Sequence, residues 1–351
     1  MSDSDQPKKP KFGLNIPWLH HDTPDEAAAK EAQKLAKIEL ERRVTQVREA
    51  EMRRQSSDMA ELQRGGIPIQ AVNRLKEIGE SSGSIFTSDL APEEAALLRR
   101  EGYRPLGLVT GSAMYHVGQA YASATNDCEV RVLSEAYDQA CWLAVRRLRI
   151  ELDHIGAHGV VGVRITMMRH EWADKTIEVQ VIGTAVQGSG SKPKNPWLCD
   201  LSGQEWWALH RAGYEPAGLV WGHASWFILT TYNDEWNITS WQNVEMAHWS
   251  AALSHARRIA MKTIHEQASQ HGACGVGGVR IDRRMDEVRL TGGEGDVYER
   301  EHHNLVLAIF GTAIRPRPGA PSTVRATQHV LSLREGRLSP VAIDARDVKI
   351  E

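Results

Sequence analysis

The sequence GAHGVVGVRI at residues 156–165 decides the fold of this chain, because it returns as GACGVGGVRI at residues 272–281. In both stretches apolar side chains alternate with glycine or a polar residue, which is the period of a β-strand. Gly156 and Gly272 each follow a helical pattern, at the place where a left-handed glycine ends a helix best. The two stretches therefore predict, twice in one chain, a helix that leads into a strand.

Two further blocks recur in the same order. GYRPLGLVTG at residues 102–111 returns as GYEPAGLVWG at residues 213–222, and GTAV at 183–186 returns as GTAI at 311–314. The glycines of this signature are Gly107, Gly111, Gly156, Gly162, Gly183, Gly218, Gly222, Gly272, Gly278 and Gly311. Blocks that recur in a constant order are typical of internal repeats. The sequence thus predicts two divergent copies of one unit in tandem.

Each copy is expected to be a β-α-β-β unit. In the first copy, strands are predicted around residues 106–109, 161–167 and 176–181, and a helix from about Ser134. The last strand of the second copy, at residues 305–310, is apolar on both faces, so one face needs cover from another copy or another subunit. The predicted fold class is α+β: two tandem β-α-β-β units, each an antiparallel sheet with one long helix, plus a long N-terminal helical arm.

Composition divides the chain further. Residues 24–64 are rich in the helix formers Ala, Glu, Lys, Arg and Gln, with only a thin apolar stripe. This arm is either a solvent-exposed helix or the binding site of a protein partner. The predicted boundaries are a disordered tail at 1–23, a helical arm at 24–80, the first copy at 84–187, a linker at 188–194, the second copy at 195–315 and a C-terminal tail at 316–351.

Charge and cysteine content exclude several classes. The formal net charge of the 351 residues is −3, which argues against nucleic acid and anionic membranes as partners. Cys128, Cys141, Cys199 and Cys274 are widely spaced and form no C-x-x-C, which favours a reducing compartment. The N-terminus carries no apolar signal segment, and no apolar run approaches the roughly 18 residues of a membrane-spanning helix. A cytoplasmic protein is expected.

As a set, the G-x-V-x-G strand, the helix, the G-A-x-x-V-x-G-V-R-I block and the closing G-T-A resemble the YbjQ-like family of heavy-metal-binding proteins. The resemblance covers residues 84–187 and 195–315 and implies dodecin-like subunits that assemble into rings, typically pentamers. It therefore implies self-association, as a ring-like homo-oligomer or as pseudo-symmetric pairing of the two copies. The family's Asp after the Arg-Ile pair is present as Asp282, whereas Thr166 replaces it in the first copy.

A divalent or soft metal ion is the cofactor that this resemblance suggests. Such a site needs Cys or His side chains that converge from a rigid backbone. Cys274 stands where the first copy has His158, and His271 is close to it in sequence. The candidate metal ligands are His154, His158, His271, Cys274 and Asp282. The alternative is that these are surface or loop residues without a ligand.

Tryptophan is concentrated in the second copy, where seven of the eleven lie between residues 206 and 249. The side chain offers a large contact area and can stack on a planar ligand. The dodecin-like topology makes a flavin-like ligand conceivable, but packing in the core and at subunit interfaces is the interpretation that we favour. The candidate ligand or interface residues are Trp221, Trp226, Trp236 and Trp241.

No pairing of a nucleophile with a base is legible in the sequence, so an enzyme is not expected. The first hypothesis is a non-enzymatic cytoplasmic protein that oligomerises through two heavy-metal-binding domains. The second hypothesis is a protein that binds a metal or a small planar ligand.

Overall fold

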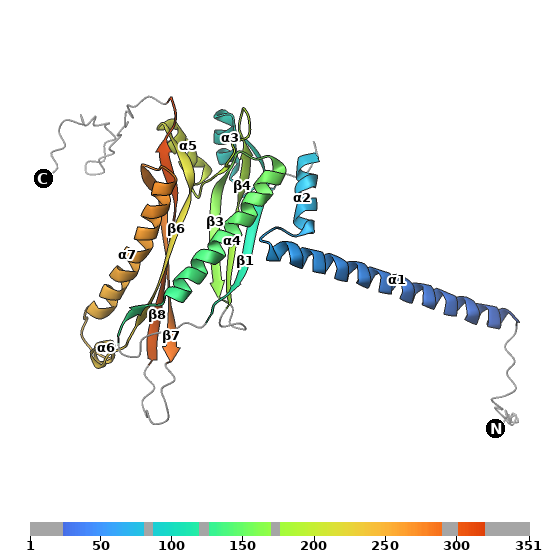
Figure 1. Cartoon of the computed structure of the whole chain (residues 1–351), viewed down its shortest axis with the longest axis horizontal. Helices are drawn as coiled ribbons and strands as arrows, with labels where there is room; N and C mark the ends of the chain where they lie inside the picture. Colours follow the sequence, from blue (N-terminus) through green and yellow to red (C-terminus); the bar gives the residue numbers. More distant parts are fainter. Residues whose placement is uncertain (1–23, 81–86, 119–125, 170–175, 290–300, 320–351) are drawn as a thin grey trace, which may run out of the picture. The chain divides into compact units, whose positions relative to one another are not determined.

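The computed structural model describes residues 24–80, 87–118, 126–169, 176–289 and 301–319 (Figure 1). The predicted tail at 1–23 and nearly all of the predicted tail at 316–351 lie outside these residues. The chain divides into two compact units, residues 1–61 and residues 62–351. The finer division into copies and linker remains an expectation.

Within the described residues, the helices and strands follow one another as α1 (Pro24–Gln63), α2 (Ile69–Glu80), α3 (Pro92–Arg100), β1 (Arg104–His116), β2 (Cys128–Glu129), α4 (Arg131–Ile155), β3 (Gly159–Arg169), β4 (Thr176–Gln187), β5 (Trp197–Leu198), α5 (Gly203–Arg211), β6 (Tyr214–Ile228), α6 (Tyr232–Ile238), α7 (Ala247–Gln270), β7 (Gly275–Arg289) and β8 (Glu301–Pro316). Among these residues, no helix combines the length and apolar character that crossing a membrane requires.

The strands form two four-stranded sheets, in the orders β1-β4-β3-β5 and β2-β6-β8-β7. All neighbouring strands are antiparallel except β3 and β5, which pair in parallel. The predicted α+β class is therefore confirmed, with one parallel pair that the purely antiparallel prediction lacked. The strand orders do not by themselves establish a duplication, which stays a prediction.

Helix α4 packs on the first sheet, against β1 and β4. Its apolar positions recur every three or four residues, so Tyr137, Cys141, Ala144 and Leu148 all point into the core and are buried. The helix begins at Arg131, slightly before the predicted start. It ends where Gly156 takes the left-handed conformation, with φ of 67°, as the sequence predicted.

Helix α7 packs on the second sheet, against β6 and β8. Its buried stripe consists mainly of alanines, among them Ala256 and Ala260, which let the helix approach the sheet closely. A Cβ atom on Gly222 of β6 would collide with the carbonyl oxygen of Ala260. Gly111 of β1 has the same relation to the carbonyl oxygen of Ala144 in α4. Close helix-to-sheet contact is therefore the physical reason for these two glycines.

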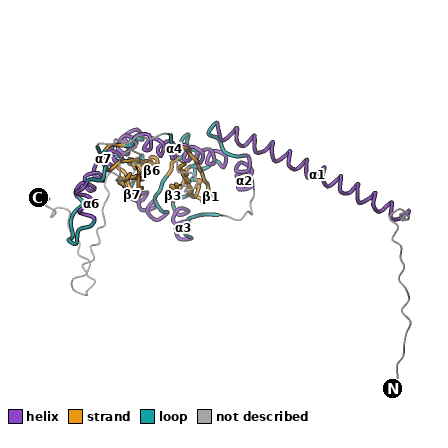
Figure 2. The backbone as a smooth tube through the Cα atoms, turned by 90° about the horizontal axis from the view of Figure 1, so that it is seen from below, coloured by secondary structure: helices purple, strands orange, loops and turns teal. Residues whose placement is uncertain are grey.

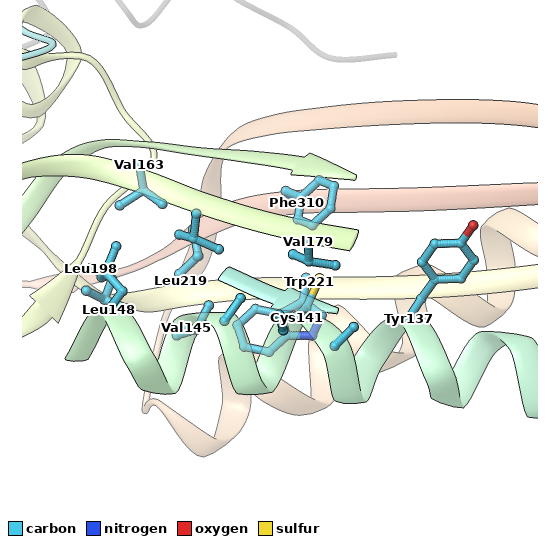
Figure 3. Packing of buried hydrophobic residues seen from close by; sticks show 14 of the residues in the cluster. Tyr137, Cys141, Val145, Leu148, Val163, Val179, Leu198, Leu219, Trp221 and Phe310 are labelled. Atoms are coloured by element: carbon cyan, nitrogen blue, oxygen red, sulfur yellow. The ribbon is translucent and has the colours of Figure 1, made fainter. Parts of the chain in front are cut away.

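Strands β6 and β8 of the second sheet are buried on both faces. One face meets α7, and the other contributes Leu219, Trp221 and Phe310 to the core around α4 (Figure 3). The cover that residues 305–310 require on their second face therefore comes from α4 and the first sheet of the same chain. Figure 2 shows the strands of the two sheets side by side, with α4 and α7 along the same side of them.

The two sheets exchange short strands. β5 follows the first sheet in the chain and returns to pair with β3, through Gly159 and Trp197. β2 leaves the first sheet and pairs with β6, through Cys128 and Phe227. Strand exchange ties the two sheets into one body, which sequence periodicity alone did not predict.

Helices α3 and α5 contact each other and cover a third core. Ser202 begins α5 with the predicted capping box, since its hydroxyl accepts a hydrogen bond from the N–H of Glu205 and the Glu205 carboxylate accepts one from the N–H of Ser202. The Glu94 carboxylate of α3 accepts a hydrogen bond from the N–H of Gly203, at 3.0 Å. The third core consists of Leu98, Val161, Val186, Cys199, Leu201 and Trp206.

Candidate functional site

The contact between α4 and the second sheet contains a buried polar cluster. The Nδ1 atom of His223 lies 2.6 Å from a carboxylate oxygen of Asp138, and its Nε2 atom lies 3.7 Å from the sulfur of Cys141. The His223 ring stacks on the ring of Tyr137 and makes an edge-on contact with the ring of Phe310. The cluster therefore holds α4 in one register against β6 and β8.

This cluster contains the residue types of a nucleophilic triad but not the conditions for one. A catalytic thiol must be accessible and must ionise readily. Cys141 is fully buried, and burial, together with the charge of Asp138, raises the pKa of its thiol. The sequence missed this cluster because Asp138 and His223 lie far apart in the chain and neither belongs to a recurring block.

A second polar cluster joins the segment before β2 to helices α6 and α7. His248 lies between two carboxylates, with Nδ1 at 2.8 Å from Asp234 and Nε2 at 2.8 Å from Asp127. Burial lowers the pKa of His248, but hydrogen bonds to Asp234 and Asp127 outweigh this effect, and the net shift is upward. The pKa of Asp234 is shifted downward, because hydrogen bonds from Thr231 and His248 outweigh its desolvation.

Strand β3 and the segment after β4 complete the contact between the two sheets. Arg280 of β7 donates to the carbonyl oxygen of Val163 at 3.1 Å, and Arg169 of β3 forms an ion pair with Asp286 at 2.9 Å. The N–H of Gly162 donates to the carbonyl oxygen of Leu201, so the edge of β3 is covered. Residues of the second predicted copy thus cover one side of the first sheet.

The corresponding side of the second sheet is open. Ile281 and Met285 of β7 stand opposite Ile309 and Leu305, on the face that carries α7. Ile281 is nevertheless 53% exposed and Met285 40% exposed, because α7 covers β6 and β8 and leaves β7 bare. In the first sheet, Ile165 matches Ile281 and packs against the core, and Val163 is completely buried, whereas its counterpart Val279 is 46% exposed. Strand β7 is also the outermost strand of its sheet.

The first sheet has an open face of its own. Met114 of β1 and Met168 of β3 stand opposite the same residue of β4, on the face away from α4. Met114 is 55% exposed and Met168 is 44% exposed. In the second sheet, the face away from α7 packs against α4 and is buried. Each sheet thus exposes apolar side chains on a face that is buried in the other sheet.

A cavity of about 800 Å³ lies where α4, α5 and the end of α7 meet the start of β6 and the end of β8. Its lining includes aromatic rings from three segments: Tyr103, Trp197, Trp206 and His210, which contact one another edge-on or stacked. Charged groups complete the wall, namely Arg149, Glu215, Arg315 and Arg317. The sequence missed this cavity because its residues come from both predicted copies.

Two of the histidines that line this cavity have lowered pKa values. Burial, followed by the charge of Arg317, lowers the pKa of His210. Burial, followed by the charges of Arg149 and Arg315, lowers the pKa of His271. Burial is thus the main cause in both cases, and arginine charges add to it.

The predicted metal ligands are not assembled. His158 and His271 both line the cavity, but His158 already accepts a hydrogen bond from the N–H of Gly188. The Nδ1 atom of His154 bonds to its own helix at Ile150, and the Cys274 thiol donates to the carbonyl oxygen of Ile314. Asp282 lines a separate surface hollow beside Tyr137. Within the described residues, no group of three His, Cys, Asp or Glu side chains is placed to hold a metal ion.

The four candidate tryptophans do not gather at one place. Trp221 lies in the core between α4 and the second sheet, and Trp226 stacks on His255 of α7. Trp236, in α6, and Trp241, after it, are exposed. Trp221 therefore packs within the chain, and the role of the two exposed tryptophans stays a prediction.

The comparisons with known proteins address the family. No family model matches the chain, and no solved structure matches it. The encapsulin nanocompartment protein Rv1762c of Mycobacterium tuberculosis is 34% identical over 245 residues, which cover 68% of this chain and 88% of the relative. The chain therefore belongs to the family of this encapsulin nanocompartment protein.

The YbjQ-like resemblance is accordingly wrong, since nothing matches that family and the relative carries a different description. The descriptions as a heavy-metal-binding protein and as a binder of a metal or flavin-like ligand are wrong with it. The physical reason lies in the motifs themselves. Gly111 and Gly222 are required wherever a helix crosses a strand this closely, so they report packing and do not identify a family.

Proposed function

We propose that this chain is a component of a protein nanocompartment, as the name of its relative describes, and that it joins copies of itself head to tail. The proposal rests on one observation. Inside the chain, one side of the first sheet packs on the outer face of the second sheet, whereas the two corresponding surfaces, one on each sheet, are exposed. The closed contact joins α4 and β3 to the outer face of the second sheet. The open counterparts are the β7 side of α7 and the outer face of the first sheet.

The proposal treats the two sheets as copies of one unit, with boundaries near residues 84–187 and 195–315. Matching polar contacts support this relation. The hydroxyl of Thr184 accepts a hydrogen bond from the N–H of Asp89, and that of Thr312 accepts one from the N–H of Asp200. The Glu151 carboxylate accepts from the N–H of Thr110, and in the same way the Gln267 amide oxygen accepts from the N–H of Trp221.

The edge of β7 offers the second argument. In the first unit, residues 197–201 cover the edge of β3, and the N–H groups of Gly162 and Val163 donate to them. Within the chain, no described segment pairs with β7 on its outer side. Residues 87–90 lie at the start of the first unit, as residues 198–201 lie at the start of the second. We infer that residues 87–90 of a neighbouring copy pair with the β7 edge, by strand addition.

Head-to-tail contacts of this kind are heterologous, because two different surfaces meet. They close into a ring or continue as an open assembly, depending on the rotation between neighbours. Apolar side chains stand on both surfaces, with Met114 and Met168 on one and Ile281 and Met285 on the other. Burial of these side chains would stabilise the contact by roughly 25 cal/mol per Å² of apolar surface.

The test uses two variants that each disable one surface. In light scattering after size exclusion, the wild type should have a mass that is a multiple of 39.1 kDa. The double variant Ile281→Glu/Met285→Glu and the variant Met114→Glu should each be monomeric. Mixed together, they should form a one-to-one dimer, because each retains the surface that the other lacks. Val132→Glu changes a similarly exposed residue outside both surfaces and is the control.

A monomeric wild type would refute head-to-tail assembly. So would a mixture that stays monomeric while each variant retains the wild-type circular dichroism spectrum and melting temperature. An assembly that survives both variants would place the contact elsewhere.

Helix α1 supports a second function, the binding of a protein partner. Its exposed apolar side chains are Leu35, Ile38, Leu40, Val44, Val47, Met52 and Met59. Exposed apolar side chains of this kind offer surface that a partner protein can cover. Deletion of residues 24–61 should leave the mass of the self-assembly unchanged and abolish co-purification of another nanocompartment protein. Unchanged co-purification would contradict this role.

A further inference from the structure

The walls of the 800 Å³ cavity carry more positive than negative charge. Arg315 is paired with Glu215 at 2.7 Å, so these two charges offset each other. Arg149 donates to the carbonyl oxygen of Pro196, and Arg317 bonds to the ring of His210. In the described part of the chain, neither of these guanidinium groups forms an ion pair with a carboxylate. The cavity therefore has two cations in excess.

Arg149 and Arg317 are both partly buried, so part of their hydration is lost. Desolvation lowers the pKa of Arg149, and the charge of Asp153 offsets only part of this effect. Asp153 itself is paired with Lys192 at 2.8 Å. Buried charges in proteins are as a rule paired, or hold an ion of opposite charge. An anion in the cavity would supply the missing partner of Arg149 and Arg317.

We propose that the cavity is a binding site for a phosphate-type oxyanion. Arg149 and Arg317 supply its charge partners. Several donors that reach the ligand from separate segments suit a tetrahedral dianion better than a flat monovalent carboxylate. The cavity also has room for an anion larger than inorganic phosphate. The site stands independently of the head-to-tail assembly, because all its residues come from one chain.

The experiment is calorimetric titration of the full chain at pH 7.5 with inorganic phosphate, pyrophosphate and, separately, acetate. Phosphate or pyrophosphate should bind with a stoichiometry of one per chain, and acetate should not. Tighter binding of pyrophosphate would indicate a phosphate ester or polyphosphate as the natural ligand, and tighter binding of phosphate would indicate the free ion.

Two variants assign the site. Arg149→Gln and Arg317→Gln should each weaken binding at least tenfold, whereas Arg43→Gln, a control in the exposed part of α1, should not change it. Each variant is first compared with the wild type by circular dichroism. No binding by the wild type, or equal binding by all folded variants, would overturn the proposal.

Discussion

The Nε2 atom of His248, in α7, lies 2.8 Å from a carboxylate oxygen of Asp127, which precedes β2. This contact joins the start of β2, which leaves the first sheet, to α7, which covers the second sheet. Asp127 also accepts a hydrogen bond from the N–H of Leu229, so the same side chain holds the end of β6. The relationship makes the fold sensitive to pH.

The first prediction concerns this pH dependence. The folded pKa of His248 is raised, so its contribution to stability is present below its unfolded pKa of about 6.5 and is lost as pH rises through the folded value. The folded pKa of Asp234 is lowered, so its contribution is present above about pH 3.9 and is lost as pH falls through the folded value. The contact should stabilise the fold most between these limits.

His248→Gln should therefore lower the free energy of unfolding near pH 5.5 by about 1 kcal/mol, a modest value because the pair is partly exposed. The difference from the wild type should shrink as pH rises through the folded pKa of His248. Urea unfolding at several pH values measures it. A difference that does not vary with pH would show that the histidine acts only by packing.

The second prediction concerns Asp200, whose buried carboxylate has a pKa raised to about 6. Desolvation is the main cause, and one oxygen, Oδ2, has no hydrogen-bond partner in the described residues. A raised acid pKa means that stability falls as pH rises from the unfolded pKa of about 3.9 to the folded value, and that the full cost of the charged form remains above it. Asp200→Asn should therefore stabilise the protein at pH 8 by roughly 1–3 kcal/mol, and little at pH 4. Thermal unfolding at both pH values tests this, and equal effects would contradict it.

The third prediction concerns the close approach of α7 to β6. A Cβ atom at position 222 would meet the carbonyl oxygen of Ala260, so Gly222→Ala should cost about 1–3 kcal/mol through overpacking. The matched control is Gly275→Ala, since the nearest atoms to a Cβ there belong to the Ile314 side chain at 3.8 Å. Chemical unfolding compares the two, and similar costs would show that backbone entropy rather than collision matters.

The fourth prediction concerns Glu151, which is buried and accepts from Arg74 at 2.7 Å and from the N–H of Thr110 at 2.8 Å. Glu151→Gln keeps an acceptor for Thr110, as Gln267 does for Trp221, and should cost about 1 kcal/mol. Glu151→Leu leaves both donors without a partner and should cost about 3 kcal/mol. Equal losses in the two variants, measured by urea unfolding, would contradict a hydrogen-bonding role.

The sequence determined the local structure of this protein. Alternating apolar residues predicted β3 and β4, and a stripe of period three to four predicted α4 up to its end at Gly156. The α+β class followed from these elements. Local structure is accessible in this way because its causes, side-chain direction and backbone sterics, act between residues close in the chain.

The family could not be inferred from the same residues. The recurring glycines satisfy steric needs that many β-α-β-β arrangements share, and so they suggested a family to which the chain does not belong. A long alignment with one relative, which includes the variable residues between these glycines, identified the family instead.

Only the tertiary structure decided where the chemistry lies. Asp138, Cys141 and His223 meet because α4 packs on the outer face of the second sheet, and the 800 Å³ cavity brings together Arg149 of α4 and Arg317, which follows β8. Strands β2 and β5 are two residues long and pair across the two sheets. Contacts between distant residues depend on how whole elements pack, and no periodicity within an element records that packing.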